Sequence, residues 1–268
     1  MTTPHDASPP GAAGTWFFAS DLHGRVERYR ALLAAVAAER PAAVLLGGDL
    51  LPHAFAGADG FLEEWLGPEL AALRAALGDA YPRVVAIPGN DDPRALEPAW
   101  QALADAGLWD YLAGAWTTIA GVPVLGYPWV PPTPFQLKDW ERYDVSRFTD
   151  PGCVAPEEGR HSVPIDARAL RRRTIAADLD ALASDRDLSS AVLLCHGPPY
   201  RTVLDRAGLD GQSVDHVPLD VHVGSIALRR LVTGRRPRLV LSGHVQEAAR
   251  LTGVWRERLD DTWLIGAC

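Results

Sequence analysis

The sequence predicts an α/β fold, and two observations support this prediction. Short apolar runs that are typical of buried strands alternate along the chain with longer stretches of helical period. The composition, with 47% hydrophobic and 22% charged residues in a chain of 268, is that of a globular protein with a sizeable core. The sequence contains no internal repeat, and we expect a single domain over residues 15–268.

The predicted strands are the short apolar runs, which are followed by glycine, proline or polar residues. In chain order they cover residues 15–20, 42–48, 83–89, 122–128, 190–195, 237–243, 248–256 and 261–268. The predicted helices are the longer stretches between them, in which apolar residues recur at helical spacing. They cover residues 26–40, 59–78, 94–107, 166–184 and 224–234. Pro41 ends the first helix, and the second is broken near Gly67 and Pro68 and closed by Gly78.

Two segments depart from this alternation. Residues 1–14 are rich in Pro, Gly and Ala, and we expect them to form a disordered N-terminal tail. Residues 128–165, called the aromatic segment below, combine many prolines with no sustained period. The aromatic side chains of this segment favour a packed lid over disorder, because disordered segments are poor in aromatic residues. They are Trp129, Phe135, Trp140, Tyr143 and Phe148.

Charge and cysteine content exclude several classes of function. The net charge of -8 argues against long nucleic acid as the main partner, since such proteins need an excess of Lys and Arg. A small anionic ligand stays compatible, because bound cations reverse the local field. The three cysteines are too scattered for a disulfide framework, so we expect a reduced, cytoplasmic protein. We expect no membrane span and no signal peptide, and the oligomeric state stays open.

Side chains that bind metals follow five of the predicted strands. They are Asp21 and His23, then Asp49, then Asn90, Asp91 and Asp92, then His196, and finally His244. Each alone is more simply a turn or helix-cap residue. Together, they bring carboxylate, amide and imidazole donors to the strand ends, where ligands bind in α/β sheets. Such donors suit Mn, Fe, Zn or Ni.

The order of these motifs resembles the calcineurin-like metallophosphoesterase superfamily. The chain contains Asp-x-His at 21–23, Gly-Asp at 48–49, Gly-Asn-x-Asp at 89–92, His196, and Gly-His at 243–244. The stretch from 222 to 248 further resembles a bacterial and archaeal branch of these phosphoesterases. The resemblance extends from about Thr15 to the C-terminus. It implies a four-layer α-β-β-α sandwich, in which two mixed β-sheets lie face to face and the metal site lies at the C-terminal ends of the strands.

The resemblance also implies two metal sites and a reaction. The first site would consist of Asp21, His23, Asp49 and Gln246, and the second of Asp49, Asn90, His196 and His244, with Asp49 shared. The expected cofactors are two divalent ions, with Mn favoured and Fe, Zn or Ni as alternatives. The implied activity is hydrolysis of a small phosphodiester or phosphomonoester by a hydroxide that the two metals activate.

Two residues depart from the family pattern. Many members have His where this chain has Asp91, and a carboxylate beside two cations would stay ionised and be a poor general acid. The leaving group would then have to be good, or another acid would serve. His222 and His53 are candidates, although each also fits an exposed or capping histidine. Gln246 stands where a second imidazole is expected, and its amide oxygen is a weaker donor; it either completes the first site or points away.

Other residues leave alternatives open. Tyr200 and Arg201 follow His196, so they contact either substrate or the loop, and Asn90 is a further candidate for substrate binding. The arginines 171–173 are most simply a solvated helix face. Two rival functions stay open: a degenerate member that binds metal or a phosphate ligand without efficient turnover, and an interaction module that docks partners through the aromatic segment.

Overall fold

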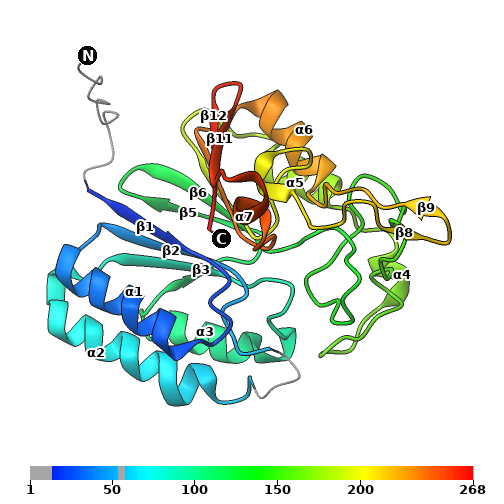
Figure 1. Ribbon diagram of the computed structural model, residues 1–268. Helices are drawn as coiled ribbons and strands as arrows, with labels where there is room; N and C mark the ends of the chain where they lie inside the picture. The colour runs from blue at the N-terminus through cyan, green and yellow to red at the C-terminus, as the bar shows by residue number, and fades with distance from the viewer. Residues whose placement is uncertain (1–13, 54–57, 268) are drawn as a thin grey trace.

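The computed structural model describes residues 14–53 and 58–267, so the predicted tail lies outside the described residues except for Gly14. Two β-sheets lie face to face, with helices on the outer side of each (Figure 1). The first sheet has the order β1-β2-β3-β4, formed by Trp16–Ala19, Ala43–Gly47, Arg83–Ile87 and Asp110–Tyr111. All three of its strand pairs are parallel.

The second sheet has six strands, in the order β11-β12-β10-β7-β6-β5. Its strands are β5 (Ala115–Ile119), β6 (Val122–Tyr127), β7 (Val192–Cys195), β10 (Leu239–Ser242), β11 (Arg256–Leu259) and β12 (Thr262–Gly266). The pairs β5–β6 and β11–β12 at its two edges are antiparallel, and the inner pairs are parallel. The predicted α/β sandwich is thus confirmed. Of the two sheets expected to be mixed, only this one is.

The side chains of each strand point alternately to the two faces of its sheet, and this explains the layers of the sandwich. In β2, Ala43 and Leu45 point into the core between the two sheets, whereas Val44 and Leu46 point toward the helices. Successive side chains of a strand face opposite sides, so a strand buried on both faces is apolar throughout. In β7, Val192 and Leu194 lie between the sheets in the same way. The continuous apolar runs are therefore the signature of a sheet covered on both sides.

The helices cover the outer faces. Helices α1 (Val26–Glu39), α2 (Gly67–Leu77) and α3 (Glu97–Asp105) pack on the first sheet, and α5 (Ile175–Ala183) and α6 (Ile226–Arg235) on the second. Helix α1 ends at Arg40 in a left-handed conformation before Pro41. Helix α2 begins with Gly67 and Pro68, after the π-helical turn η1 (Phe61–Leu66). At the predicted break the chain instead stays helical: Leu66 and Gly67 both have right-handed helical backbone angles, and the helix only changes from π to α type, with Pro68 tolerated in the first turn of α2.

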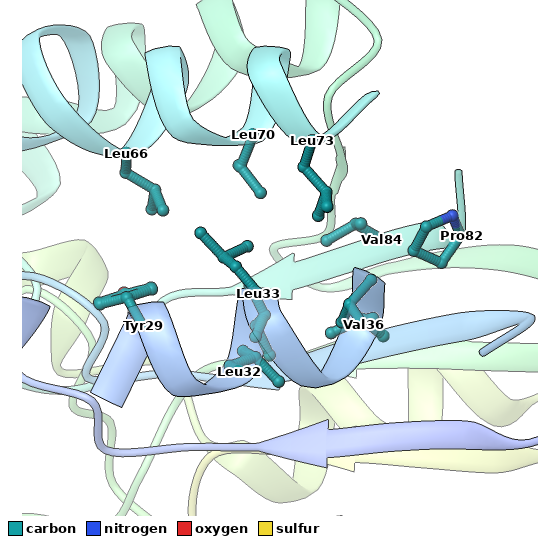
Figure 2. Close-up of a pocket in the computed structure, with 11 residues that line it drawn as sticks. Tyr29, Leu32, Leu33, Val36, Leu66, Leu70, Leu73, Pro82 and Val84 are labelled. Atoms are coloured by element: carbon teal, nitrogen blue, oxygen red, sulfur yellow. The ribbon is translucent and has the colours of Figure 1, made fainter. Parts of the chain in front are cut away.

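A small apolar cavity remains between α1, α2 and the first sheet. Its volume is about 20 Å³, and its lining includes Leu33 and Val36 of α1, Leu70 of α2 and Val84 of β3 (Figure 2). A space of this size has room for about one water, and its lining exposes no polar atoms that could hold one. It is a packing defect rather than a ligand site.

Two predicted elements, and the expected place of one run of arginines, need correction. Residues 166–184 form two helices, α4 (Ala167–Leu170) and α5, because Thr174 caps the second helix through the N–H of Ala177. The arginines 171–173 lie in the turn between them rather than on a helix face. Residues 248–256 do not form one strand: Ala248–Thr252 is the short helix α7, which ends at Gly253, and β11 begins only at Arg256.

Several elements have no counterpart in the sequence prediction. Strands β4 and β5 are short or half-exposed, so their apolar pattern is weak. The two-residue strands β8 (Ser213–Val214) and β9 (Val217–Pro218) form a separate hairpin. The single 3-10 turns η2 (Gly78–Ala80) and η4 (Val203–Asp205) were not predicted as separate elements, whereas η3 (Arg94–Leu96) is the first turn of the predicted helix 94–107 and precedes α3.

The aromatic segment is packed onto both halves of the sandwich. The Trp140 indole donates to the carbonyl of Asp92 over 2.8 Å, and the Asp139 carboxylate accepts the N–H of Arg94, both on the side of the first sheet. On the other side, the Asp144 carboxylate caps α6 by accepting the N–H of Ile226 over 2.6 Å. Trp140 and Tyr143 are buried, Trp129 is half-buried, and Phe135 and Phe148 are exposed.

Among the described residues, none of the helices has the length and apolar character needed to cross a bilayer.

Candidate metal centre

The carboxyl ends of β1, β2, β3, β7 and β10 meet at one edge of the sandwich, and the predicted ligands lie just beyond them. Asp49 is at the middle of the cluster. Its Oδ2 lies 3.4 Å from Nε2 of His196 and 3.9 Å from Nε2 of His23, although these residues come from different sheets. Ligand atoms of Asp21, Asp49 and His196 all lie within 4.8 Å of one another, and all three residues are buried.

Two glycines make this close approach possible. A Cβ built on Gly89 would lie 2.3 Å from Oδ1 of Asp49, and one built on Gly243 would lie 2.1 Å from Oδ2 of Asp21. These contacts are far inside van der Waals distance, so any side chain at either position would push a carboxylate out of place. This explains physically why glycine precedes Asn90 and His244.

Four of the predicted ligands have left-handed backbones. The φ angles are 56° at Asp21, 47° at His23, 51° at Asp49 and 70° at His244. This region costs about 1–2 kcal/mol for a non-glycine residue, and such residues concentrate at functional sites. The chain turns sharply at the end of each strand, and in this way it brings these side chains together over the sheet edge.

The first predicted site contains Asp21, His23, Asp49 and Gln246, and the structure brings all four together. The amide nitrogen of Gln246 lies 2.7 Å from Nε2 of His23 and 3.4 Å from Oδ1 of Asp21. The backbone N–H of His244 donates to the Asp21 carboxylate over 3.1 Å. Gln246 therefore points into the cluster rather than away from it, with its amide nitrogen toward His23 and Asp21.

The second predicted site contains Asp49, Asn90, His196 and His244. The amide oxygen of Asn90 lies 3.0 Å from Nε2 of His196, and Nδ1 of His196 lies 2.8 Å from the carbonyl of Gly47. The carbonyl accepts the proton of Nδ1, and this contact turns Nε2 toward Asn90 and Asp49. The ring of His244 stands edge-on to that of His196, with 5.1 Å between the centroids.

The pKa values of His196, His244 and Asp49 are shifted because these side chains are buried and lie close to other charged groups. Burial disfavours a charge on His196, but Asp49 and Asp21 outweigh this and raise the pKa of His196 to about 9. Burial and the charge of His196 together lower the pKa of His244 to about 3. The pKa of Asp49 is held below its usual range, because His196 and His23 outweigh the effect of burial.

The donor set fits divalent cations. Burial raises the pKa of Asp21, and repulsion from Asp49 adds to this effect despite the opposing charge of His196. Two buried carboxylates at this distance are costly without positive charge between them. Carboxylate, amide and imidazole groups also form the mixed oxygen and nitrogen set that Mn, Fe and Zn accept. The residues on both sides of Asp49 are therefore suited to hold one ion each.

Asp91 and Asp92 have different surroundings, although they are neighbours in sequence. The Asp91 carboxylate forms a short contact with Nδ1 of His53 and lies 3.6 Å from Nδ1 of His23. The buried Asp92 carboxylate instead accepts the N–H groups of Leu50, Leu51 and Gly89. It thereby ties the loop after β2 to the loop after β3. The sequence analysis placed Asp92 among the polar residues at the strand ends but in neither metal site, and it did not identify this structural role.

His222, Tyr200 and Arg201 lie together in a second group. Nδ1 of His222 lies 2.7 Å from the fully buried Asp205 carboxylate, which also accepts the N–H of Arg201. The Tyr200 hydroxyl donates to Asp220 over 2.5 Å, and its ring stands edge-on to His222. Within the described part of the chain, these hydrogen bonds do not extend to a predicted metal ligand. The structure thus joins the three residues to one another but not to the cluster around Asp49.

Comparisons with known proteins identify the family. The family model described as calcineurin-like phosphoesterase matches residues 16–248. The chain also resembles the crystal structure of TT1561 of Thermus thermophilus, with 18% identity and a TM-score of 0.51, over 94% of this chain and 87% of that one. A second crystal structure has 15% identity and a TM-score of 0.56, over 93% and 88% of the two chains.

Among curated proteins, none matches the chain. At these identities, the two structural matches establish the fold alone. The family model covers most of the chain, from β1 to the loop that carries His244 and Gln246. The chain therefore belongs to the calcineurin-like phosphoesterase family.

Proposed function

We propose that the chain hydrolyses a small phosphodiester or phosphomonoester with two divalent cations, of which Mn²⁺ is the favoured ion. The first would be held by Asp21, His23, Asp49 and Gln246, and the second by Asp49, Asn90, His196 and His244. Metal-dependent hydrolysis of phosphoesters is the activity that membership of the family implies.

One observation carries the proposal. The Asp49 carboxylate lies within 3.9 Å of ring nitrogens from both predicted sites, and its Oδ1 accepts the N–H of Asp91 over 2.8 Å. It is thus held between the two sheets at the one point that both donor sets share. A structural aspartate at a strand end has no need of two imidazoles from distant parts of the chain.

When bound, a pair of divalent cations lowers the pKa of water and neutralises charge on a phosphate. The residues of this chain orient the reactants. The carbonyl of Gly47 fixes the ring of His196, and the backbone N–H of His244 fixes the Asp21 carboxylate. Asn90 presents an amide to the same space, so it is suited to bind either a cation or a phosphate oxygen. Gln246 can act as a ligand if its amide rotates by half a turn and presents its oxygen.

The proposal extends to the substrate. Asp91 is unsuited to protonate a leaving group, which favours substrates whose leaving group is good, such as an aryl or nucleotide ester. Tyr200, Arg201 and His222 form a polar group near the chain segment that follows His196, and they are the proposed contacts for the leaving portion of the substrate. The acidic net charge favours a small substrate over a nucleic-acid chain.

One alternative has an observation of its own. The Gln246 amide faces Asp21 and His23 with its nitrogen, which is a donor and not a ligand. A member of the family with an incomplete first site would bind metal or phosphate without efficient turnover. The exposed Phe135 and Phe148 likewise suit an interaction module that docks partners through the aromatic segment.

The test combines metal content with turnover. We expect the purified protein to bind two equivalents of Mn²⁺ and to hydrolyse p-nitrophenyl phosphate or bis-p-nitrophenyl phosphate. Asp49→Asn should abolish turnover and leave the fold intact by circular dichroism. Asp261→Asn, a matched change in the exposed turn between β11 and β12, should leave turnover unchanged. Two bound metals without hydrolysis of either ester would support the non-catalytic alternative, and absence of metal binding would refute the proposed site.

A further inference from the structure

The two departures from the family pattern touch the same side chain, His23. Gln246 contacts one ring nitrogen of this imidazole, with its amide nitrogen 2.7 Å from Nε2. Asp91 faces the other, with Oδ2 3.6 Å from Nδ1. Positions 91 and 246 are far apart in the sequence, but in the fold they flank a single metal ligand.

The surroundings of the ring favour a proton on one nitrogen of His23. The Asp91 carboxylate beyond Nδ1 is an acceptor, so it favours the proton on Nδ1 and leaves Nε2 for a cation. This is the tautomer that a ligand coordinating through Nε2 requires. Nδ1 is buried and has no hydrogen-bond partner among the described residues, while the Asp91 carboxylate stands directly beyond it.

Asp91 is itself held in place. Its backbone N–H donates to Oδ1 of Asp49 over 2.8 Å, and its carboxylate contacts Nδ1 of His53. The His53 ring stacks on the ring of His23 at a centroid distance of 4.8 Å and an angle of 29°. His23 is therefore bounded by Asp91 at its edge and by His53 on its face, and both restrict how its ring can turn.

We propose that Asp91 is a positioning residue that orients His23 as a ligand of the first metal and so compensates for the weaker donor at Gln246. A carboxylate behind a coordinating imidazole fixes the ring and makes it a stronger donor, and losing such a partner weakens metal binding by about 10–100-fold. The inference rests on the proposed function, because it requires that the first site binds metal. It assigns Asp91 a role other than that of the histidine it replaces.

The experiment measures stepwise Mn²⁺ affinity by calorimetry and electron paramagnetic resonance on the full chain. We expect Asp91→Ala to weaken by about 10–100-fold the binding step that Gln246→Ala also weakens. In Asp91→Ala, the other Mn²⁺ binding step, which is the one that Asn90→Ala weakens, should keep its wild-type affinity. Asp91→Asn retains an acceptor without the charge, and it should give an intermediate loss. Asp261→Ala, which removes an exposed carboxylate far from the site, is the matched control for charge.

A double-mutant cycle tests the compensation directly. In a Gln246→His background, the first site has a second imidazole, and Asp91→Ala should then cost clearly less affinity than in the wild type. Circular dichroism and the intact second step verify that each variant is folded. Asp91→Asn and Asp91→Ala with wild-type affinity for both ions would overturn the positioning role, as would an equal loss in both backgrounds.

Three outcomes separate this inference from others. A third equivalent of Mn²⁺ that depends on both Asp91 and His53 would overturn it, because His23, His53 and Asp91 would then form a metal site of their own. A wild-type protein that binds no Mn²⁺ would refute the proposed function together with this inference. A wild-type protein that binds two ions, with unchanged affinities in the Asp91 variants, refutes only the inference.

Discussion

Replacement of Asp92 by alanine should destabilise the protein strongly, although Asp92 is not among the predicted ligands. Its carboxylate accepts the N–H of Gly89 over 2.8 Å, of Leu51 over 2.8 Å and of Leu50 over 3.1 Å, and the side chain is buried. Alanine would leave these three buried donors without their acceptor. Each unsatisfied donor costs about 1–3 kcal/mol, so three of them give a loss of about 3–9 kcal/mol in the free energy of unfolding. A domain has only about 5–15 kcal/mol in total.

The measurement is urea-induced unfolding followed by tryptophan fluorescence, in chelator so that metal binding does not contribute to stability. Asp92→Asn keeps one acceptor oxygen and should lose about half as much. Asp261→Ala, an exposed control, should stay within about 0.5 kcal/mol of the wild type. A loss below about 1 kcal/mol for Asp92→Ala would refute the reasoning, because the loops after β2 and β3 would then not depend on this carboxylate.

Three other changes test the packing and the aromatic segment. Lys138→Met should lower the free energy of unfolding, measured in urea, by about 3–5 kcal/mol, because it leaves the buried Glu141 carboxylate without the Lys138 ammonium that lies 2.6 Å away. A variant as stable as the wild type would contradict this. Val84→Ile should raise the free energy of unfolding by up to about 0.8 kcal/mol, because the added methylene fills the cavity of Figure 2. A lower free energy of unfolding would show that the cavity has no room for the added group. If the aromatic segment is a lid, replacing Phe135 and Phe148 with alanine should raise KM for a nucleotide ester more than KM for p-nitrophenyl phosphate, whereas equal shifts would indicate packing alone.

The α/β class and the candidate ligands at the strand ends were predictable from sequence, because both depend on local patterns. A strand buried on two faces is continuously apolar, so runs such as β2 and β7 are visible without a structure. The turn after such a strand lies at the sheet edge, and a carboxylate or imidazole there marks a site. Asp49 and His196 were identified in this way.

Boundaries were less predictable where capping and local composition conflict. The stretch 166–184 has a helical period throughout, yet the cap at Thr174 begins a new helix within it. Residues 248–252 contain Leu251 and Thr252, which suit a strand. They form a helix because Ala248 packs in the small core with Val245, and because Gly253 closes the turn with a left-handed backbone.

The sequence by itself determined the family motifs, the order of the candidate ligands and the two positions that depart from the pattern. Only the tertiary structure decided that both departures, Asp91 and Gln246, flank the ring of His23, and that Asp92 ties two loops together. These contacts join residues between 41 and 223 positions apart, as in the pairs Leu51–Asp92 and His23–Gln246. No local propensity encodes such a pairing, since it arises only when five strands from two sheets end at the same edge.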